Sequence, residues 1–371
     1  MGFNRVPYAI WASGAFPKLR SFPRQAGIQG RHDLHFWPLG PRLSRGRAGE
    51  GRLGVRSARL VLGALVSLFA GNLPAVADTT PGQYRSIVEN TITHYLRPEF
   101  RALTVETEAL AAAMAGLCQS PSEARRSAAK ESFAKVLAAW SRVEYARLGP
   151  VIVEKRLERF SFWPDPKGIG LRQVQKLLTG KDETATDPAT LAGKSVAVQG
   201  LQALEFILFG TGSDGLAAGD EFRCRYGDAV AENLDTIAKE ILAGWNDEAG
   251  YVALMRGPGP DNPVYRNEGE AANDIIEMLT TGFQFIRDVK IGNFLGENPD
   301  KAKPRLGAFW RSGQTIAAIE GNFAGLKTLW EASGIAAVIE TRPGGSDAIG
   351  SIDFEFAGAE LALDKGFKPL E

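Results

Sequence analysis

The stretch SVAVQGLQALEFILFG, residues 195–210, is the most apolar helical segment downstream of residue 78. Its apolar side chains recur at the three- and four-residue spacing of one helix face: Ala197, Leu201, Leu204 and Leu208. Glu205 is the only charged residue in the stretch. Because a helix so poor in charge is normally buried, the sequence predicts a buried helix that carries one carboxylate into the interior.

Glu205 is the best candidate for a functional residue. Ser195, Gln199 and Gln202 precede it at intervals of three or four residues, so we expect one polar stripe along the helix. A buried ionised carboxylate needs partners. One interpretation is a site for a hard cation such as iron, calcium or manganese, with oxygen ligands drawn from Glu205, Gln202, Asp165, Glu144 and Asp288. The alternative is a buried ion pair between Glu205 and Arg142, Arg156 or Arg159.

The segments on both sides of this stretch also have a helical pattern. Helices are expected over residues 84–117, 123–147, 171–178, 187–210, 220–254, 268–291, 304–333 and 349–367. Convincing alternating β runs are absent from the sequence. We therefore predict an all-α protein of two helical-bundle-like halves, residues 78–210 and 220–371, packed together and joined by a Gly-rich linker at 211–219.

The N-terminal residues have the pattern of a targeting segment. An apolar run of 11 residues, Leu60 to Ala70, follows two arginines and precedes Ala75-Val76-Ala77. Residues 55–77 are thus expected to be a signal peptide, cleaved after Ala77, and the run is too short to span a bilayer. Residues 1–54, rich in Arg, Gly and Pro, are interpreted as a start site assigned too far upstream, or as a disordered basic arm for nucleic acid.

The full chain has a formal net charge of zero, but the expected mature chain is acidic. Residues 1–77 hold 11 of the 43 Lys and Arg residues and 2 of the 43 Asp and Glu residues. Residues 78–371 therefore carry 32 basic and 41 acidic residues, a net charge of −9. An acidic exported protein is a poor nucleic-acid binder and suits cations or soluble partners.

The two cysteines, Cys118 and Cys224, lie in the exported part, where an oxidising compartment permits a disulfide. The alternative is two separate buried thiols.

The histidine content argues about catalysis, because His94 is the only histidine after residue 77 and no His-Glu-x-x-His motif occurs. Zinc hydrolases commonly use two or three imidazoles, so the sequence argues against a peptidase of that kind.

Two further segments could line a cleft. The connection Phe162-Trp163-Pro164-Asp165-Pro166 holds a carboxylate between two prolines, and it would serve either as a cleft wall or as an aromatic plug in which Asp165 caps the next helix. In the second half, Asp288, Lys290 and Arg311 could join Arg156 and Arg159 in a charge network that faces Glu205. The alternative is a solvated face with weak surface ion pairs.

These segments together resemble the imelysin family, over roughly residues 83–330. The resemblance rests on the Trp140 helix, Gly149-Pro150, Arg159 with Phe162-Trp163-Pro164-Asp165, the 200–205 motif, Lys290 and Trp310-Arg311-Ser312. The family signature Gly-x-His-x-x-Glu corresponds to Gly200-Leu201-Gln202-Ala203-Leu204-Glu205, so glutamine stands where the family has histidine. Gly200, Trp163 and Pro164 are expected to be structural.

The resemblance implies an exported two-domain helical protein associated with iron uptake or iron-regulated expression, whose signature His and Glu are suspected metal ligands. Glutamine is a weak neutral ligand and cannot act as a general base. Our leading hypothesis is a periplasmic, non-enzymatic component of iron uptake that works with periplasmic or membrane iron-transport components. The alternatives are a scaffold that binds a protein or peptide without metal, and, less favoured, a metallopeptidase.

Overall fold

The computed structural model describes residues 79–296 and 299–366, and within these ranges the chain is helical with no β-strand. This confirms the predicted all-α class. The expected signal peptide, its cleavage after Ala77 and the proposed origin of residues 1–54 lie outside the described residues. In the described part of the chain, no helix combines the length and apolar character that a membrane crossing requires.

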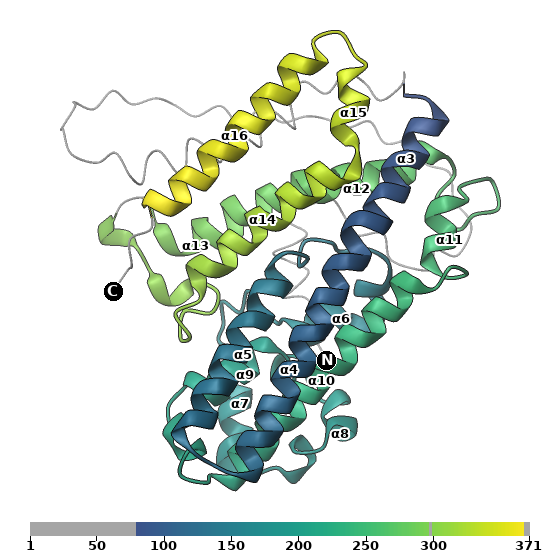
Figure 1. Cartoon of the computed structure of the whole chain (residues 1–371). Coiled ribbons are helices and arrows are strands. Elements are labelled where there is room, and N and C mark those ends of the chain that lie inside the picture. Colours follow the sequence, from purple (N-terminus) through teal and green to yellow (C-terminus); the bar gives the residue numbers. More distant parts are fainter. Residues whose placement is uncertain (1–78, 297–298, 367–371) are drawn as a thin grey trace.

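A long rod of three consecutive helical segments begins the described chain (Figure 1). Helix α3 (Pro81–Thr91) starts at a capping box in which Thr80 and Gln83 satisfy each other's backbone N–H groups. The π-helical turn η2 (Ile92–Leu96) leads into α4 (Arg97–Gln119) and ends two residues before Pro98. Because proline lacks an N–H and clashes with the carbonyl four residues earlier, the wider turn lets the rod continue through it.

The first bundle comprises α4 to α10. Helix α4 packs most extensively on α10 (Glu221–Asn246) and on α5 (Glu123–Ser141), and α9 (Leu201–Phe209) packs on α10, α7 and α5. Shorter helices cover its sides: α6 (Arg156–Phe160), α7 (Ile169–Gly180) and α8 (Pro188–Ala192). A disulfide between Cys118 and Cys224, with Cα atoms 5.4 Å apart, joins the end of α4 to the start of α10.

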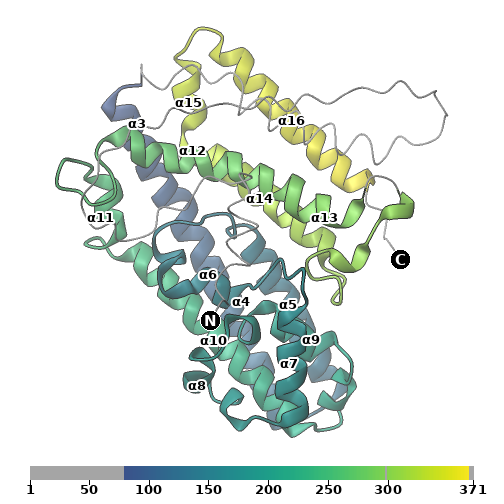
Figure 2. The same cartoon turned by 180° about the vertical axis from the view of Figure 1, so that it is seen from behind.

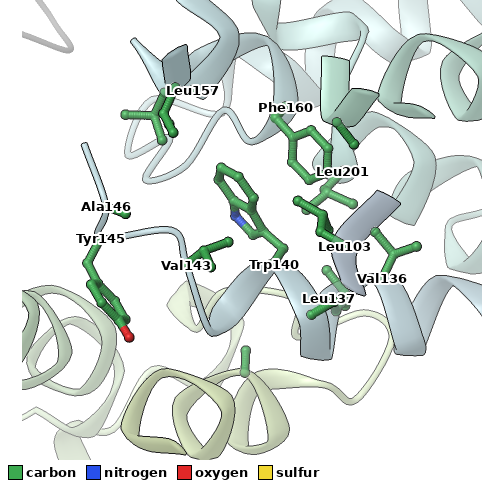
Figure 3. Packing of buried hydrophobic residues seen from close by; sticks show 14 of the residues in the cluster. Leu103, Val136, Leu137, Trp140, Val143, Tyr145, Ala146, Leu157, Phe160 and Leu201 are labelled. Carbon is green, nitrogen blue, oxygen red and sulfur yellow. The ribbon is translucent and has the colours of Figure 1, made fainter. Parts of the chain in front are cut away.

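Aromatic packing fills the interior of the first bundle. The rings of Trp140 and Phe160 stack with centroids 4.3 Å apart, and Leu103, Val136 and Leu201 surround the pair, as Figure 3 shows. All five side chains are buried. Such burial stabilises the fold by about 1.5–3 kcal/mol for each large side chain.

The second bundle comprises α3 and α12 to α16. Its members are α12 (Glu268–Gln284), the π-helix η8 (Phe285–Ile291), α13 (Gly292–Leu295), α14 (Thr315–Ser333), α15 (Ile335–Glu340) and α16 (Gly345–Gly366). Helix α3 packs on α12 and α14, and α11 (Tyr251–Arg256) lies between α10 and α12. In both views, the second bundle lies across one end of the first bundle (Figures 1 and 2).

The bundles group the helices differently from the division of the sequence at 211–219. Helix α3 precedes the linker but joins the second bundle, while α10 follows the linker and packs on α4. Three predicted helices are also broken, and the one over 220–254 divides at residues 247–250 into α10 and α11. Residues 193–200 interrupt the one over 187–210, so Ser195 and Gln199 do not share a helix with Glu205. Helix α14 begins at Thr315 rather than near 304.

Candidate functional site

Glu205 lies on α9 and is bound by the turn 307–314, which precedes α14. Its Oε1 accepts a hydrogen bond from the backbone N–H of Ser312 at 3.0 Å and another from the Ser312 hydroxyl at 2.9 Å. The backbone N–H of Arg311 adds a further favourable interaction. Successive N–H groups that converge on an anion form a nest. Glu205 thereby ties the first bundle to the turn that leads into α14.

Burial and hydrogen bonding act on Glu205 in opposite directions. Burial raises the pKa of Glu205, because loss of hydration disfavours the charged carboxylate, while the Ser312 donors and the charge of Arg311 oppose this effect. The side chain is 3% exposed. Burial in turn lowers the pKa of Arg311, whose guanidinium lies 4.4 Å from the centre of the Trp310 ring and 5.6 Å from that of Phe206. The negative charge of Glu205 is therefore offset within the site by the positive charge of Arg311.

The turn 307–314 owes its shape to two residues with positive φ, Phe309 at 59° and Gly313 at 72°. A left-handed conformation costs a residue with a Cβ atom about 1–2 kcal/mol. The turn is closed by the hydrogen bond that the Gln314 N–H donates to the Phe309 carbonyl at 3.0 Å, and the Ser312 hydroxyl, whose one proton is donated to Glu205, lies 3.0 Å from the same carbonyl. The Phe309 ring is buried beneath it. This packing holds the N–H groups of the turn toward Glu205.

Gln202 lies one turn before Glu205 on α9. Its Nε2 donates to the Ser161 hydroxyl at 3.0 Å. Its Oε1 is buried and has no hydrogen-bond partner within the described ranges. Gly200 starts the helix where another segment crosses closely, because a Cβ there would lie 2.5 Å from the carbonyl oxygens of both Arg159 and Phe160. Any larger residue at position 200 would push that segment away.

A second buried polar cluster joins the bundles at Glu144. The Nζ of Lys290 lies 2.6 Å from Glu144 Oε1, as an ion pair rather than an aligned hydrogen bond. Asn322 Nδ2 donates to the same oxygen at 2.8 Å and to the Ser141 carbonyl at 2.5 Å. The side chains of Lys290 and Glu144 are 2% and 6% exposed. The first bundle contributes the carboxylate, and the second contributes both donors.

Aromatic rings surround the ammonium group of Lys290. The ring centres of Trp163, Phe285 and Phe309 lie 5.2, 5.3 and 5.7 Å from its Nζ. Ring faces attract a cation, more strongly where water is excluded. Phe309 thus links the two polar clusters, since it shapes the turn that binds Glu205 and also contacts Lys290.

Close backbone packing between α5 and α14 brings these groups together. A Cβ on Gly321 would lie 2.8 Å from that of Ser141, and one on Gly325 would lie 2.5 Å from the Tyr145 hydroxyl. In the same contact, Tyr95 donates to the Arg142 carbonyl at 2.5 Å, and its hydroxyl lies 2.8 Å from that of Tyr145. Two small residues one turn apart therefore let α14 approach the end of α5.

The remaining candidates are engaged elsewhere. Asp165 accepts from the N–H groups of Ile169 at 2.9 Å and Gly170 at 2.7 Å, which is the capping geometry. Trp163 packs edge-on against Phe285, as an aromatic plug would, and its bond to Pro164 is cis. Asp288 pairs with its neighbour Arg287 near the surface.

The three arginines considered as partners of Glu205 have other acceptors. Arg142 binds Glu99 at 2.6 and 2.7 Å. Arg156 binds Glu240 at 2.8 Å. Arg159 donates to the side chains of Gln199 at 3.0 Å and Asn233 at 3.1 Å. The expected Glu205–arginine ion pair is therefore replaced by the Ser312 contact, with only Arg311 close by.

The donor set does not fit a resident metal ion. Each carboxylate proposed as a ligand is committed to other groups: Glu205 to Ser312, Asp165 to backbone N–H groups, Glu144 to Lys290 and Asn322, and Asp288 to Arg287. Over residues 79–296 and 299–366 no group of three or more His, Cys, Asp or Glu side chains could hold a metal. A hard cation needs several converging oxygens, and these side chains do not supply them.

Sequence reasoning missed Ser312 as the direct partner of Glu205, and it missed Asn322 and Phe309. Asn322 carried a usable signal, because it follows Gly321 and lies one turn before Gly325 in the predicted helix over 304–333. Small residues at that spacing mark close helix contacts. Ser312 was singled out only as part of Trp310-Arg311-Ser312, and its contact with Glu205 could not be foreseen because it depends on the backbone geometry of the turn.

Comparisons with known proteins give one consistent result. The model of the imelysin family matches residues 96–370. The fold is similar to that of an imelysin-like protein from Psychrobacter arcticum 273-4, with a TM-score of 0.63 and 18% identity over 78% of this chain and 86% of that one.

The fold is also similar to that of a "putative iron-regulated protein A precursor" from Parabacteroides distasonis ATCC 8503, with a TM-score of 0.50 and 13% identity over 80% of this chain and 97% of that one. Among curated proteins, none matches the sequence. The family match spans most of the chain and includes both polar clusters. The chain belongs to the imelysin family.

Proposed function

We propose that the protein is an exported, non-enzymatic component of an iron-acquisition system, in which Glu205 fastens the two bundles together and is not a metal ligand. The observation that carries this proposal is how the residues of the 200–205 motif are bonded. The resemblance places Gln202 where the family signature has histidine, and Glu205 Oε1 accepts two hydrogen bonds from Ser312. A carboxylate held by a preformed nest is saturated on that oxygen without a metal.

The same geometry argues against hydrolysis. A general base must have a pKa near the working pH and reach a water or substrate proton. Glutamine has no such pKa, and Glu205 is 3% exposed and bound by Ser312. The iron role is supported by family membership and by the name of the iron-regulated protein A precursor, whose fold is similar.

Growth under iron limitation tests the proposal in the native host. A strain without the gene is expected to grow more slowly than its parent when iron is chelated, and added iron salts or the wild-type gene should restore growth. Equal growth of both strains at every iron concentration would reject the iron role. The remaining alternative would then be a scaffold that binds a protein or peptide without metal.

Activity of the purified protein tests the second part. We expect no chelator-sensitive cleavage of an unfolded protein substrate such as casein. The control is the variant Glu205→Gln, which retains a side-chain oxygen for the Ser312 N–H. Cleavage that disappears both with chelator and in Glu205→Gln would overturn the non-enzymatic assignment.

A further inference from the structure

Helix α16 has one buried face and one apolar outward face. The inner side chains Ile352, Phe356, Ala359 and Leu363 are buried, and Phe356 packs against Phe283 of α12 with ring centres 5.4 Å apart. On the opposite side, Phe354 is 74% exposed and Leu361 is 52% exposed. Both views place α16 at the outer edge of the second bundle, with α14 on its inner side (Figures 1 and 2).

The outward residues follow the spacing of a helix-packing seam. Gly350, Phe354, Ala357 and Leu361 are separated by four, three and four residues and are all exposed. This is the interval at which one helix presents side chains to another. The small residues at 350 and 357 leave room beside the two large ones, since a Cβ on Gly350 would meet no atom within 4 Å. We call Gly350, Phe354, Ala357 and Leu361 the outer stripe.

The outer stripe is bordered by acidic residues. Helix α16 contains five acidic residues and one lysine, a net charge of −4. Asp347, Asp353 and Glu360 lie beside the stripe on the helix surface and are exposed. Two of them are held from the inner side, Asp353 by the Trp330 indole N–H at 3.1 Å and Glu360 by Lys327 at 2.8 Å. The neutral Trp330 donor holds the negative charge of Asp353 next to the apolar side chains, whereas Lys327 offsets the charge of Glu360.

This charge selects among occupants of the outer stripe. A second copy of α16 would bring its own acidic border against this one, and like charges at close range are unfavourable. An anionic lipid surface is disfavoured for the same reason. A helix with apolar residues at heptad spacing and flanking Lys or Arg would cover Phe354 and Leu361 and neutralise the border.

We propose that the outer stripe of α16 is a docking surface for a cationic amphipathic helix of a partner protein. The surface lies on the second bundle, and the proposal depends neither on the iron role nor on Glu205. Apolar contact supplies the affinity, and the acidic border supplies the preference for a basic partner. Phe354 is the anchor, because it is the most exposed of the large apolar side chains in the described ranges.

Binding of a designed peptide to the full chain tests the proposal. The probe is a labelled helix of about 21 residues with Leu at the heptad a and d positions and Lys beside them. Its matched partner replaces every Lys by Glu. Fluorescence anisotropy is read with the wild type, with Phe354→Ser/Leu361→Ser, and with the control Val105→Ser, which removes another exposed apolar side chain, 58% exposed, from α4.

The expected result is saturable binding of the Lys peptide only, weakened about tenfold or more in Phe354→Ser/Leu361→Ser and unchanged in Val105→Ser. Raising sodium chloride from about 50 mM to about 300 mM should weaken it, because salt screens the acidic border. Circular dichroism should show that both variants remain folded, since the altered side chains are exposed.

Three results would overturn the proposal. The Lys peptide could fail to bind, could bind the double variant as well as it binds the wild type, or could bind no better than the Glu peptide. Sedimentation velocity decides on the second copy, since dimers that disappear in Phe354→Ser/Leu361→Ser would make self-association the role of the stripe. Equivalent Phe354-dependent binding to vesicles of anionic phospholipid would make it a membrane surface instead.

Discussion

The buried pair of Lys290 and Glu144 gives the sharpest test of how the bundles are joined. The variant Lys290→Met keeps an unbranched side chain among Trp163, Phe285 and Phe309 but removes the charge. Glu144, whose side chain is 6% exposed, then loses its direct ion-pair partner, although the guanidinium of Arg147 still attracts it. Breaking a buried pair from one side costs about 3–5 kcal/mol, so we expect a loss of that size in the free energy of unfolding.

The double variant tells a charge effect from a packing effect. Glu144→Gln alone leaves the Lys290 ammonium unpaired and should also cost about 3–5 kcal/mol. In Glu144→Gln/Lys290→Met neither charge of the pair remains, and the new amide oxygen still accepts from Asn322. The double variant should therefore lose about 2–3 kcal/mol less than the sum of the singles.

Urea unfolding at neutral pH, followed by circular dichroism, measures all four proteins in this cycle. The control cycle uses the surface pair Lys327 and Glu360, with side chains 38% and 47% exposed, where the coupling should be below about 1 kcal/mol. Equal coupling in both cycles would refute the reasoning.

Three further predictions concern stability and are measured by urea unfolding. Burial and repulsion from Glu232 raise the pKa of Asp228 to about 6. Because this folded-state pKa lies above the usual value, ionised Asp228 destabilises the fold fully above pH 6, and this destabilisation is lost as the pH falls toward the usual value. Asp228→Asn should therefore stabilise by about 1 kcal/mol at pH 7.5, after allowance for partial exposure, and by almost nothing near pH 4. A gain that is equal at both pH values would contradict this account. Gly325→Ala should cost about 2 kcal/mol or more, because a Cβ meets the Arg142 carbonyl and the Tyr145 hydroxyl, whereas Gly350→Ala should stabilise by about 0.5–1 kcal/mol; equal effects would be inconsistent with close packing of α14. Cys118→Ser/Cys224→Ser removes a crosslink with a sequence separation of 106 and should cost about 2–4 kcal/mol, so an unchanged midpoint would show that the bond does not constrain the unfolded chain.

Local patterns explain why the fold class was predictable. Helical spacing and start signals are properties of neighbouring residues, and α8 does start at Pro188 after the Asp187 cap. The breaks were harder to see. Residues 304–314 look like a helix start in sequence, but Gly307 packs against Thr315 and Gly313 adopts a left-handed conformation.

The polar clusters could be predicted only in part, because their partners are distant in sequence. Glu205 was singled out from its apolar surroundings, yet Ser312 lies 107 residues further along the chain. Glu144 and Lys290 were also candidates, as a ligand and as part of a charge network, but their pairing depends on how α14 packs against α5. One sequence carries no information on which of several charged residues meet.

The most direct test of the central claim, that Glu205 joins the bundles without a metal, is thermal unfolding with ferrous, ferric, cupric, manganese or calcium ions, or with chelator. A ligand that binds only the folded state raises its Tm. We predict that no ion raises the Tm of the wild type more than that of Glu205→Gln, and that Glu205→Ala lowers the Tm with or without metal because the Ser312 donors lose their acceptor. A stabilisation by one ion that saturates at one equivalent and disappears in Glu205→Gln would contradict the account.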